Sequence, residues 1–276
     1  MMRRRFINGK GECLSIRALE DTTITVQVIG GGNLFAQINN GAWGNITSDP
    51  IGLSAGDVIK YKGTIKESHN SSMTGRGVVF SISNKVELFG DCTSIFEKRE
   101  LFRYALNGAF SGAPIIRVSA DFLPATTLAH MCYNQMFYNC TSLTTAPELP
   151  ATILDTECYS EMFGGCTSLT TAPSILPATT LASRCYKSMF SNCTSLTTAP
   201  ELPATTLARE CYGSMFYGCS KLNYIKAMFT TTPSSTYTSG WVSGVASSGT
   251  FVKNKNASWN VVGANGIPSG WTVKTE

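Results

Sequence analysis

A repeat of 26 or 27 residues constrains the fold of this chain more than any other feature. The unit reads LPATTLAxxCYxxMFxxCTSLTTAPE, and its first leucine is Leu123, Leu149, Leu176 and Leu202 in turn. Two cysteines eight residues apart recur in each unit. They are Cys132, Cys158, Cys185 and Cys211 in one column and Cys140, Cys166, Cys193 and Cys219 in the other. Units of this length cannot bury an apolar face alone, so they are expected to stack into a solenoid.

The period lies within the range of leucine-rich repeats, in which each unit forms a strand and a helix. At about 100° per residue, the positions that hardly change among the repeats share one half of a helix, and the variable positions share the other half. The first set is Leu128, Cys132, Tyr133, Met136, Phe137 and Cys140; the second is His130, Met131, Asn134, Gln135, Tyr138 and Asn139. This pattern predicts a helix with one buried and one solvent-facing side. Residues 141–145 then predict a short strand, closed by Pro147.

The chain outside the repeats has a different character. Residues 1–88 alternate apolar and polar side chains at 14–18, 24–28 and 58–61, with further candidate strands at 78–82 and 85–88. Short strands separated by glycine-rich turns predict a small β-sandwich. We therefore expect an α+β protein. It comprises a β-sandwich-like domain at 1–88, a leucine-rich-repeat solenoid at 89–229, and a C-terminal cap at 230–276.

Composition argues against several functional classes. Charged residues make up 14% and the net charge is +4, which is too mild for a nucleic-acid partner. The sequence contains no run of 18 apolar residues, so we predict no helix that spans a membrane. The two histidines, His69 and His130, lack catalytic partners at a suitable spacing, and the cysteines lack the spacing of a zinc site. We predict no enzyme activity, no catalytic residue, no cofactor and no metal, with most repeat cysteines buried as free thiols.

Three columns of identical side chains leave alternatives open. The tyrosine column that starts at Tyr133 and the methionine column that starts at Met136 are assigned to the core. An exposed tyrosine column would instead be a platform for stacking sugars. The threonine pair at 144–145 recurs at 170–171 and 197–198 and is attributed to β-propensity. The alternative for this pair is binding to an ordered surface.

In these motifs the sequence resembles the BspA-like leucine-rich repeat family of bacterial surface proteins. The likeness covers residues 89–276 and rests on the FxxCTSL core, the LPATTL linker and the ending GIPSGWTV at 266–273. The resemblance implies an adhesive protein that binds extracellular host proteins or other cells, without catalytic residues. Surface members carry an export signal, whereas the basic run Arg3–Arg5 is followed by no apolar segment. Either the true start lies upstream, or the protein reaches the exterior on a phage-like particle.

The expected function is therefore non-enzymatic recognition of an extracellular protein or glycan, at a cell surface or on a virion. Aromatic and arginine side chains are the usual anchors of an interface. At the variable repeat positions these are Tyr138, Arg184, Arg209 and Tyr217. Because they belong to different repeats, only an extended partner would engage them together. The alternative is a structural spacer or decoration protein of a virion or cell envelope with no specific ligand. The oligomeric state stays open.

Overall fold

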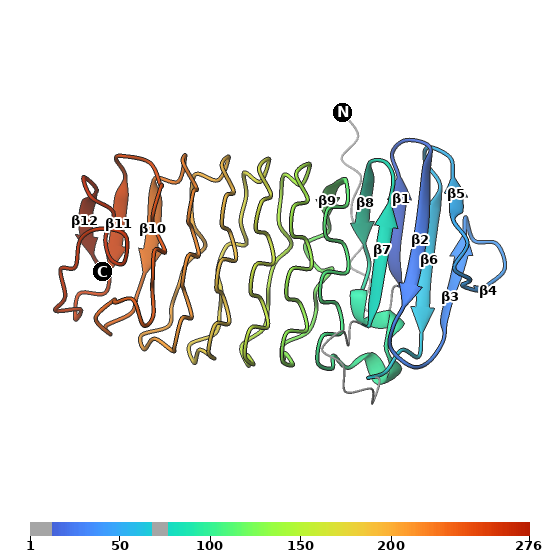
Figure 1. Ribbon diagram of the computed structural model, residues 1–276, viewed down its shortest axis with the longest axis horizontal. Helices are drawn as coiled ribbons and strands as arrows, with labels where there is room; N and C mark the ends of the chain where they lie inside the picture. Colours follow the sequence, from blue (N-terminus) through green and yellow to red (C-terminus); the bar gives the residue numbers. More distant parts are fainter. Residues whose placement is uncertain (1–12, 68–76) are drawn as a thin grey trace.

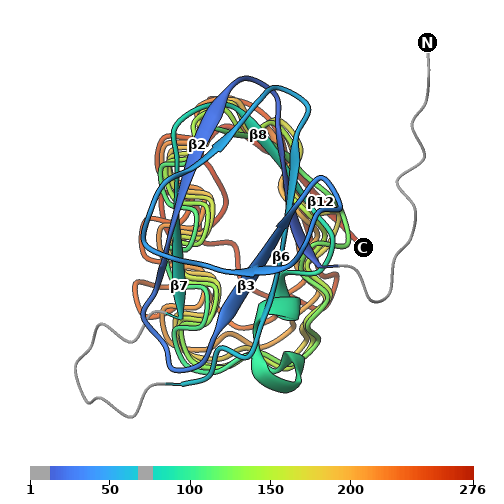
Figure 2. The same cartoon turned by 90° about the vertical axis from the view of Figure 1, so that its right-hand side faces the viewer.

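A computed structural model describes residues 13–67 and 77–276 and shows a mainly β molecule elongated along one axis (Figure 1). Arg3–Arg5 and His69 lie outside the described residues. The first eight strands are β1 (Leu14–Ala18), β2 (Thr22–Val28), β3 (Leu34–Ile38), β4 (Gly44–Asn45), β5 (Ile51–Leu53), β6 (Val58–Gly63), β7 (Val78–Ile82) and β8 (Val86–Phe89). They form two facing sheets, seen end-on in Figure 2, which we call the sandwich.

Antiparallel pairing within the sandwich follows the alternation in the sequence. One sheet has the order β4-β3-β6-β1-β8, to which β9 (Ile115–Val118) adds in parallel beside β8, and the other has the order β5-β2-β7. In β2, Thr22, Ile24 and Val26 are buried, whereas Thr23 and Gln27 are exposed. Side chains on a strand alternate between its two faces, so this pattern places one face of β2 against the core. Strands expected from alternation at 14–18, 24–28, 58–61, 78–82 and 85–88 are present.

Two 3₁₀ helices, η1 (Cys92–Ile95) and η2 (Glu97–Arg99), lead from the sandwich into a coil. Each winding of the coil, which we call a rung, is one repeat. One side of each rung consists of consecutive β-turns at residues 102–113, 129–140, 155–166, 182–193, 208–219 and 234–243. We call these six stretches the turn segments, and their outer surface the turn face.

The turn segments take the place of the expected helices. In segment 129–140, Cys132, Asn134 and Met136 donate their backbone N–H groups to the carbonyl three residues earlier. The residues between them donate to the next rung instead, for example Tyr133 N to Cys158 O at 3.0 Å. An α-helix requires bonds from each residue to the one four positions earlier. The α+β assignment with one helix per leucine-rich repeat is therefore wrong, and residues 13–67 and 77–276 contain no α-helix.

The other side of the coil is a parallel sheet that extends one sheet of the sandwich. Strand β9 (Ile115–Val118) pairs in parallel with β8, and Thr144 N donates to Ile116 O. Thr145 then bridges to Thr171 in parallel. The sheet ends in β10 (Tyr224–Ala227), β11 (Thr250–Lys253) and β12 (Thr272–Thr275), which are also parallel. We call the outer surface of residues 141–145 and their equivalents the sheet face.

The turn segments likewise extend the second sheet, because Phe80 N in β7 donates to Ala109 O in the first of them. Residues 230–276 continue the winding, with Phe216 N bound to Trp241 O and Val242 N to Ala264 O. No helix in the described part of the chain is long and apolar enough to cross a membrane.

A ladder of stacked aromatic rings runs through the core along the long axis. It passes through Phe80, Phe110, Phe137, Phe163, Phe190, Phe216 and Trp241, and neighbouring ring centroids are 4.7–6.1 Å apart. A second ladder links Tyr133, Tyr159, Tyr186 and Tyr212 at 5.7–6.0 Å. Buried apolar residues form one cluster from Leu14 to Trp271, so the sandwich and the coil share a core.

The buried half of each repeat was predicted correctly even though the helix was not. All six conserved positions of the first repeat are buried, and the eight repeat cysteines are buried and free. The tyrosine and methionine columns are also buried, so the tyrosine column is no sugar platform. Among the expected solvent-facing residues, Asn134 is buried as well and its assignment was wrong.

Candidate ligand-binding face

Side chains that differ among the repeats are concentrated on the turn face. Equivalent positions there carry Met131, Glu157, Arg184 and Glu210 in successive rungs, and Tyr138, Gly164, Ser191 and Tyr217 in another column. On the sheet face, the same threonine pair occupies 144–145, 170–171 and 197–198. The hydroxyls of Thr144 and Thr170 donate to carbonyl oxygens of the preceding rung, at 3.3 and 3.1 Å. The two faces therefore have different chemistry.

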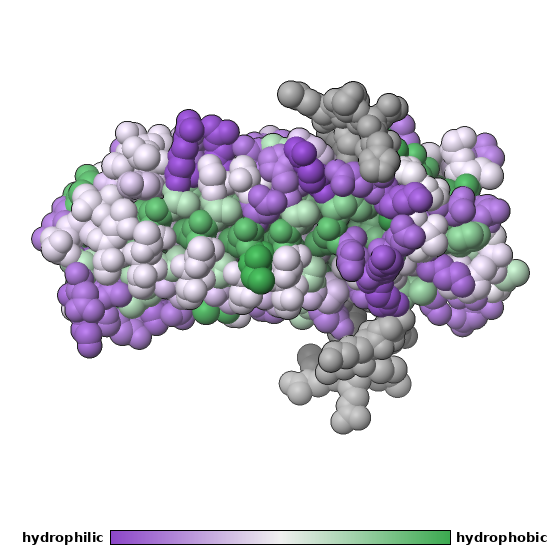
Figure 3. All heavy atoms as spheres, turned by 90° about the horizontal axis from the view of Figure 1, so that it is seen from below, coloured by the Kyte–Doolittle hydropathy of each residue, from purple (hydrophilic) through white to green (hydrophobic). Residues whose placement is uncertain are grey.

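The narrow edge of the molecule shown in Figure 3 has a third character, because apolar side chains form a strip along the middle of the coil. Charged groups suited to orienting a polar ligand are concentrated elsewhere.

A charged network joins three rungs of the turn face. Arg184 donates to Glu210 through Nε and Nη2, at 3.1 and 3.0 Å, and to Glu157 through Nη1 at 3.1 Å. Lys187 Nζ donates at 2.7 Å to Glu210 Oε2, the oxygen that also accepts from Arg184 Nε. Because hydrogen bonds from Arg184 and then Lys187 stabilise its charged form, the pKa of Glu210 falls to about 2. Glu210 therefore remains a carboxylate at neutral pH, and Arg184 is committed to bonds within the protein.

Arg209 extends from the same network into solvent. Its side chain is 72% exposed, and its Nε lies 3.5 Å from Glu210 Oε1. Backbone N–H of Arg184 donates to the carbonyl of Arg209 at 2.9 Å, so the two predicted arginines are neighbours on adjacent rungs. Of the pair, Arg209 is the one whose guanidinium group is available to a ligand.

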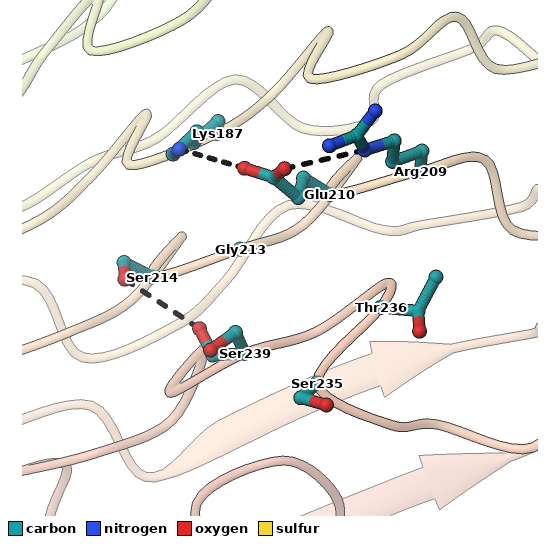
Figure 4. A pocket seen from close by; sticks show the side chains of 8 residues that line it. All are labelled: Lys187, Arg209, Glu210, Gly213, Ser214, Ser235, Thr236 and Ser239. Carbon is teal, nitrogen blue, oxygen red and sulfur yellow. Dashed lines mark hydrogen bonds and ion pairs between the residues drawn. The ribbon is translucent and has the colours of Figure 1, made fainter.

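A hollow of about 410 Å³ opens beside Arg209, where the repeats give way to residues 230–276 (Figure 4). Its lining consists of Lys187, Arg209, Glu210, Gly213, Ser214, Ser235, Thr236 and Ser239. Backbone bonds from Glu210 N to Thr236 O and from Ser214 N to Ser239 O hold the two walls together, at 2.7 and 2.8 Å. Ionic groups form one wall and hydroxyl groups form the other.

The two predicted tyrosines do not belong to this hollow. Tyr138 and Tyr217 occupy the same repeat position three rungs apart, with Gly164 and Ser191 between them. Tyr138 is half-buried and its ring lies against Gly164 of the next rung, whereas Tyr217 is 49% exposed. The structure therefore brings Arg184 and Arg209 together and leaves the tyrosines along the length of the turn face.

Sequence reasoning missed Lys187, Glu210 and the four hydroxyl residues of the hollow. Glu157, Arg184 and Glu210 share one variable repeat position, and opposite charges one repeat apart are a recognisable signal for an ion pair between rungs. Lys187 occupies another variable position. Ser235, Thr236 and Ser239 lie in a Ser/Thr-rich run that was expected only to end the repeats.

Neither a metal centre nor a catalytic histidine is evident in the described residues. No group of three or more His, Cys, Asp or Glu side chains there has an arrangement that would hold a metal ion. His130 is half-buried, and its ring packs edge-to-face against Tyr104 at 5.4 Å. No protein family, curated protein or solved structure matches the chain.

Proposed function

We propose that this protein is a non-enzymatic recognition protein whose turn face binds an extracellular protein or glycan. One observation carries the proposal: side chains that vary among the repeats are gathered on one face of a coil whose core is nearly uniform and whose opposite face repeats the same threonine pair in three rungs. Packing requirements explain a uniform core, but they do not require Arg209, Tyr217 or Lys187 at their positions. The rigid ladders of the core hold the turn face in a fixed geometry, which suits recognition of an extended partner.

The proposed setting is a bacterial surface or a phage-like particle. The resemblance of the repeat to BspA-like surface proteins supports this setting, and the scarcity of charged side chains available for acid–base chemistry supports a binding role. The sandwich would then be a base that continues both sheets into the coil, and the recognition groups would lie further along the axis.

The test compares the two faces. Purified protein is applied to arrays of glycans and extracellular-matrix proteins, together with a turn-face variant carrying Tyr138→Ala, Arg209→Ala and Tyr217→Ala. A matched sheet-face variant carries Thr171→Ala, Thr197→Ala and Thr198→Ala, all at exposed positions. We expect at least a tenfold loss of affinity in the turn-face variant and little change in the control. No binding by the parent protein, or equal losses in both variants, would contradict the proposal and favour a structural spacer.

A further inference from the structure

The hollow beside Arg209 carries a net positive charge. Three cations, Arg184, Lys187 and Arg209, surround Glu210 and Glu157, which are two carboxylates. Arg184 bridges both carboxylates, and Lys187 contacts Glu210 at 2.7 Å. Arg209 has only a 3.5 Å contact with Glu210 and is the most exposed of the three cations. The unbalanced positive charge therefore lies on Arg209, at the rim of the hollow.

The opposite wall offers hydroxyl groups in place of charge. Ser235, Thr236 and Ser239 are exposed, and Ser214 is half-buried. Ser214 Oγ donates to Ser239 O at 3.5 Å, longer than the roughly 2.5–3.0 Å of a good hydroxyl bond, so a ligand can compete for that proton. Each hydroxyl both donates and accepts. Among the described residues that line the hollow none is aromatic, so they provide no stacking surface of the kind that apolar sugar faces favour.

We propose that this hollow binds an acidic sugar residue, with the sugar carboxylate on Arg209 and the sugar hydroxyls on Ser214, Ser235, Thr236 and Ser239. The inference rests on the proposed recognition function and names its ligand class. Guanidinium is planar and bonds carboxylates through two parallel N–H donors, and Arg209 has these donors directed to solvent. The volume of about 410 Å³ lies within the range of small-molecule sites.

Glu210 has a distinct part in this selectivity. Its carboxylate is held in place by Arg184 and Lys187 and remains ionised at neutral pH, with its pKa near 2. Without it, the cations of this wall would attract any anion non-specifically. With it, the excess charge is confined to one guanidinium group, so a ligand must present a single carboxylate next to several hydroxyls. A uronic acid or a sialic acid has this combination, and a neutral hexose or inorganic sulfate has only half of it.

The experiment measures binding of free glucuronate and N-acetylneuraminate to the full chain by saturation-transfer NMR and calorimetry, with glucose and sulfate as comparison ligands. We expect Arg209→Ala to lower affinity for the acidic sugars at least tenfold and Arg209→Lys to restore part of it. Ser214→Ala combined with Thr236→Val should weaken binding of the sugars by a smaller factor. Arg117→Ala is the matched control, because Arg117 lies in β9 and its side chain is 54% exposed.

The outcomes distinguish a failure of this inference from a failure of the proposed function. Preference for acidic sugars that is lost in Arg209→Ala but kept in Arg117→Ala supports the inference. Equal binding of glucose, equal binding of sulfate, or full affinity in Arg209→Ala overturns it, while array binding through the turn face would leave the recognition function in place. Acidic glycans on the array distinguish a terminal sugar of a chain from the free monosaccharide. Absence of binding to every sugar overturns the inference, and the protein arms of the array then decide the wider proposal.

Discussion

The sandwich and the coil use the same backbone bonds in different ways. In the sandwich, β1 lies between β6 and β8 in antiparallel ladders, and alternate residues point into the core. In the turn segments, alternate N–H groups close turns within the rung and the others bond to the next rung, 25 or 26 residues along the chain. The two regions nevertheless share a continuous core. The comparison shows that the same rule, apolar side chains facing the core, holds in both regions. The hydrogen-bond partners of the backbone determine whether the chain forms a sandwich or a coil.

Alkaline pH should produce the largest difference in stability between the sandwich and the coil. Burial raises the pKa of Cys158, Cys166, Cys211 and Cys219 to about 12. In the unfolded chain a thiol ionises near pH 8.5, so above that pH the unfolded state binds fewer protons and the folded state loses stability. This loss amounts to about 1.4 kcal/mol per thiol for each pH unit and ends near pH 12. Four such thiols lower stability by roughly 5 kcal/mol per unit, so we expect the coil to unfold between about pH 9 and 11.

Urea unfolding at a series of pH values from 7 to 11 measures this slope. Cys166→Ala removes one buried thiol and should reduce the proton release on unfolding by about one. The described part of the sandwich, residues 13–67 and 77–89, contains one cysteine, Cys13, so this linkage belongs to the coil. An unfolding free energy that stays constant from pH 8 to 11 would show that the thiols are not buried.

Truncation of the aromatic ladder is the next largest effect. Phe163 is fully buried and stacks between Phe137 at 5.7 Å and Phe190 at 5.5 Å. Phe163→Ala should therefore lower the free energy of unfolding by about 3–5 kcal/mol, the usual range for a buried aromatic. Hydrogen exchange should show the greatest loss of protection in the rungs beside Phe163 and the smallest in β3 and β6, because a rung contacts only its neighbours. Uniform loss across the molecule would instead mean that sandwich and coil unfold as one unit.

The smallest of the three effects concerns glycines with positive φ. Gly165 has φ +75°, and an added Cβ would collide with Oδ1 of Asn139 in the preceding rung. Gly56 in the sandwich has φ +94° and open space around the Cβ position. We expect Gly165→Ala to cost about 2–4 kcal/mol, from both strain and overpacking, and Gly56→Ala about 1–2 kcal/mol from strain alone. Thermal denaturation compares the two variants, and adding Asn139→Gly, which removes the side chain and tolerates the positive φ of residue 139, should recover the overpacking part of the Gly165→Ala cost. Equal costs without recovery would argue against the contact between rungs.

The helix error has a definite physical source. Left-handed backbone positions in a turn segment recur every four residues, as at Met131, Gln135 and Asn139, which corresponds to 90° per residue, whereas a helix advances about 100°. Over the twelve residues of a turn segment these periods diverge by only about a third of a revolution, so both bury Cys132, Tyr133, Met136 and Phe137. The buried set could be predicted for this reason, and the backbone could not.

One signal in the sequence did distinguish the two structures. The last left-handed position of each turn segment is Gly112, Asn139, Gly165, Asn192, Gly218 and Gly244 in successive rungs. Glycine and asparagine tolerate positive φ better than other residues, and a fixed slot for them is unexpected inside a helix. In the first five segments, two further left-handed positions carry residues such as Gln135 and Glu161, which give no such signal.

Residue type and variability were sufficient to nominate Arg184 and Arg209 for the site, but their different roles depend on position. Glu157 and Glu210 form ion pairs with Arg184 because the rungs align residues 26 or 27 apart. The residue type of Arg184 does not by itself indicate these ion pairs. The hydroxyl wall could not be predicted, since it forms where Ser235 and Thr236 return to the turn face after the repeats have lost their consensus.

The direction of the bonds between rungs has a mechanical consequence. These bonds run along the long axis, from one rung to the next, while the chain itself winds across that axis. Tension applied between the sandwich and the last rung therefore acts on the bonds at every boundary between rungs. The weakest boundary opens first, and its bonds break one after another. Each rung that detaches releases 26 or 27 residues of slack, or up to roughly 90 Å of extended chain. A tether built in this way lengthens in steps under tension and recoils when the rungs stack again.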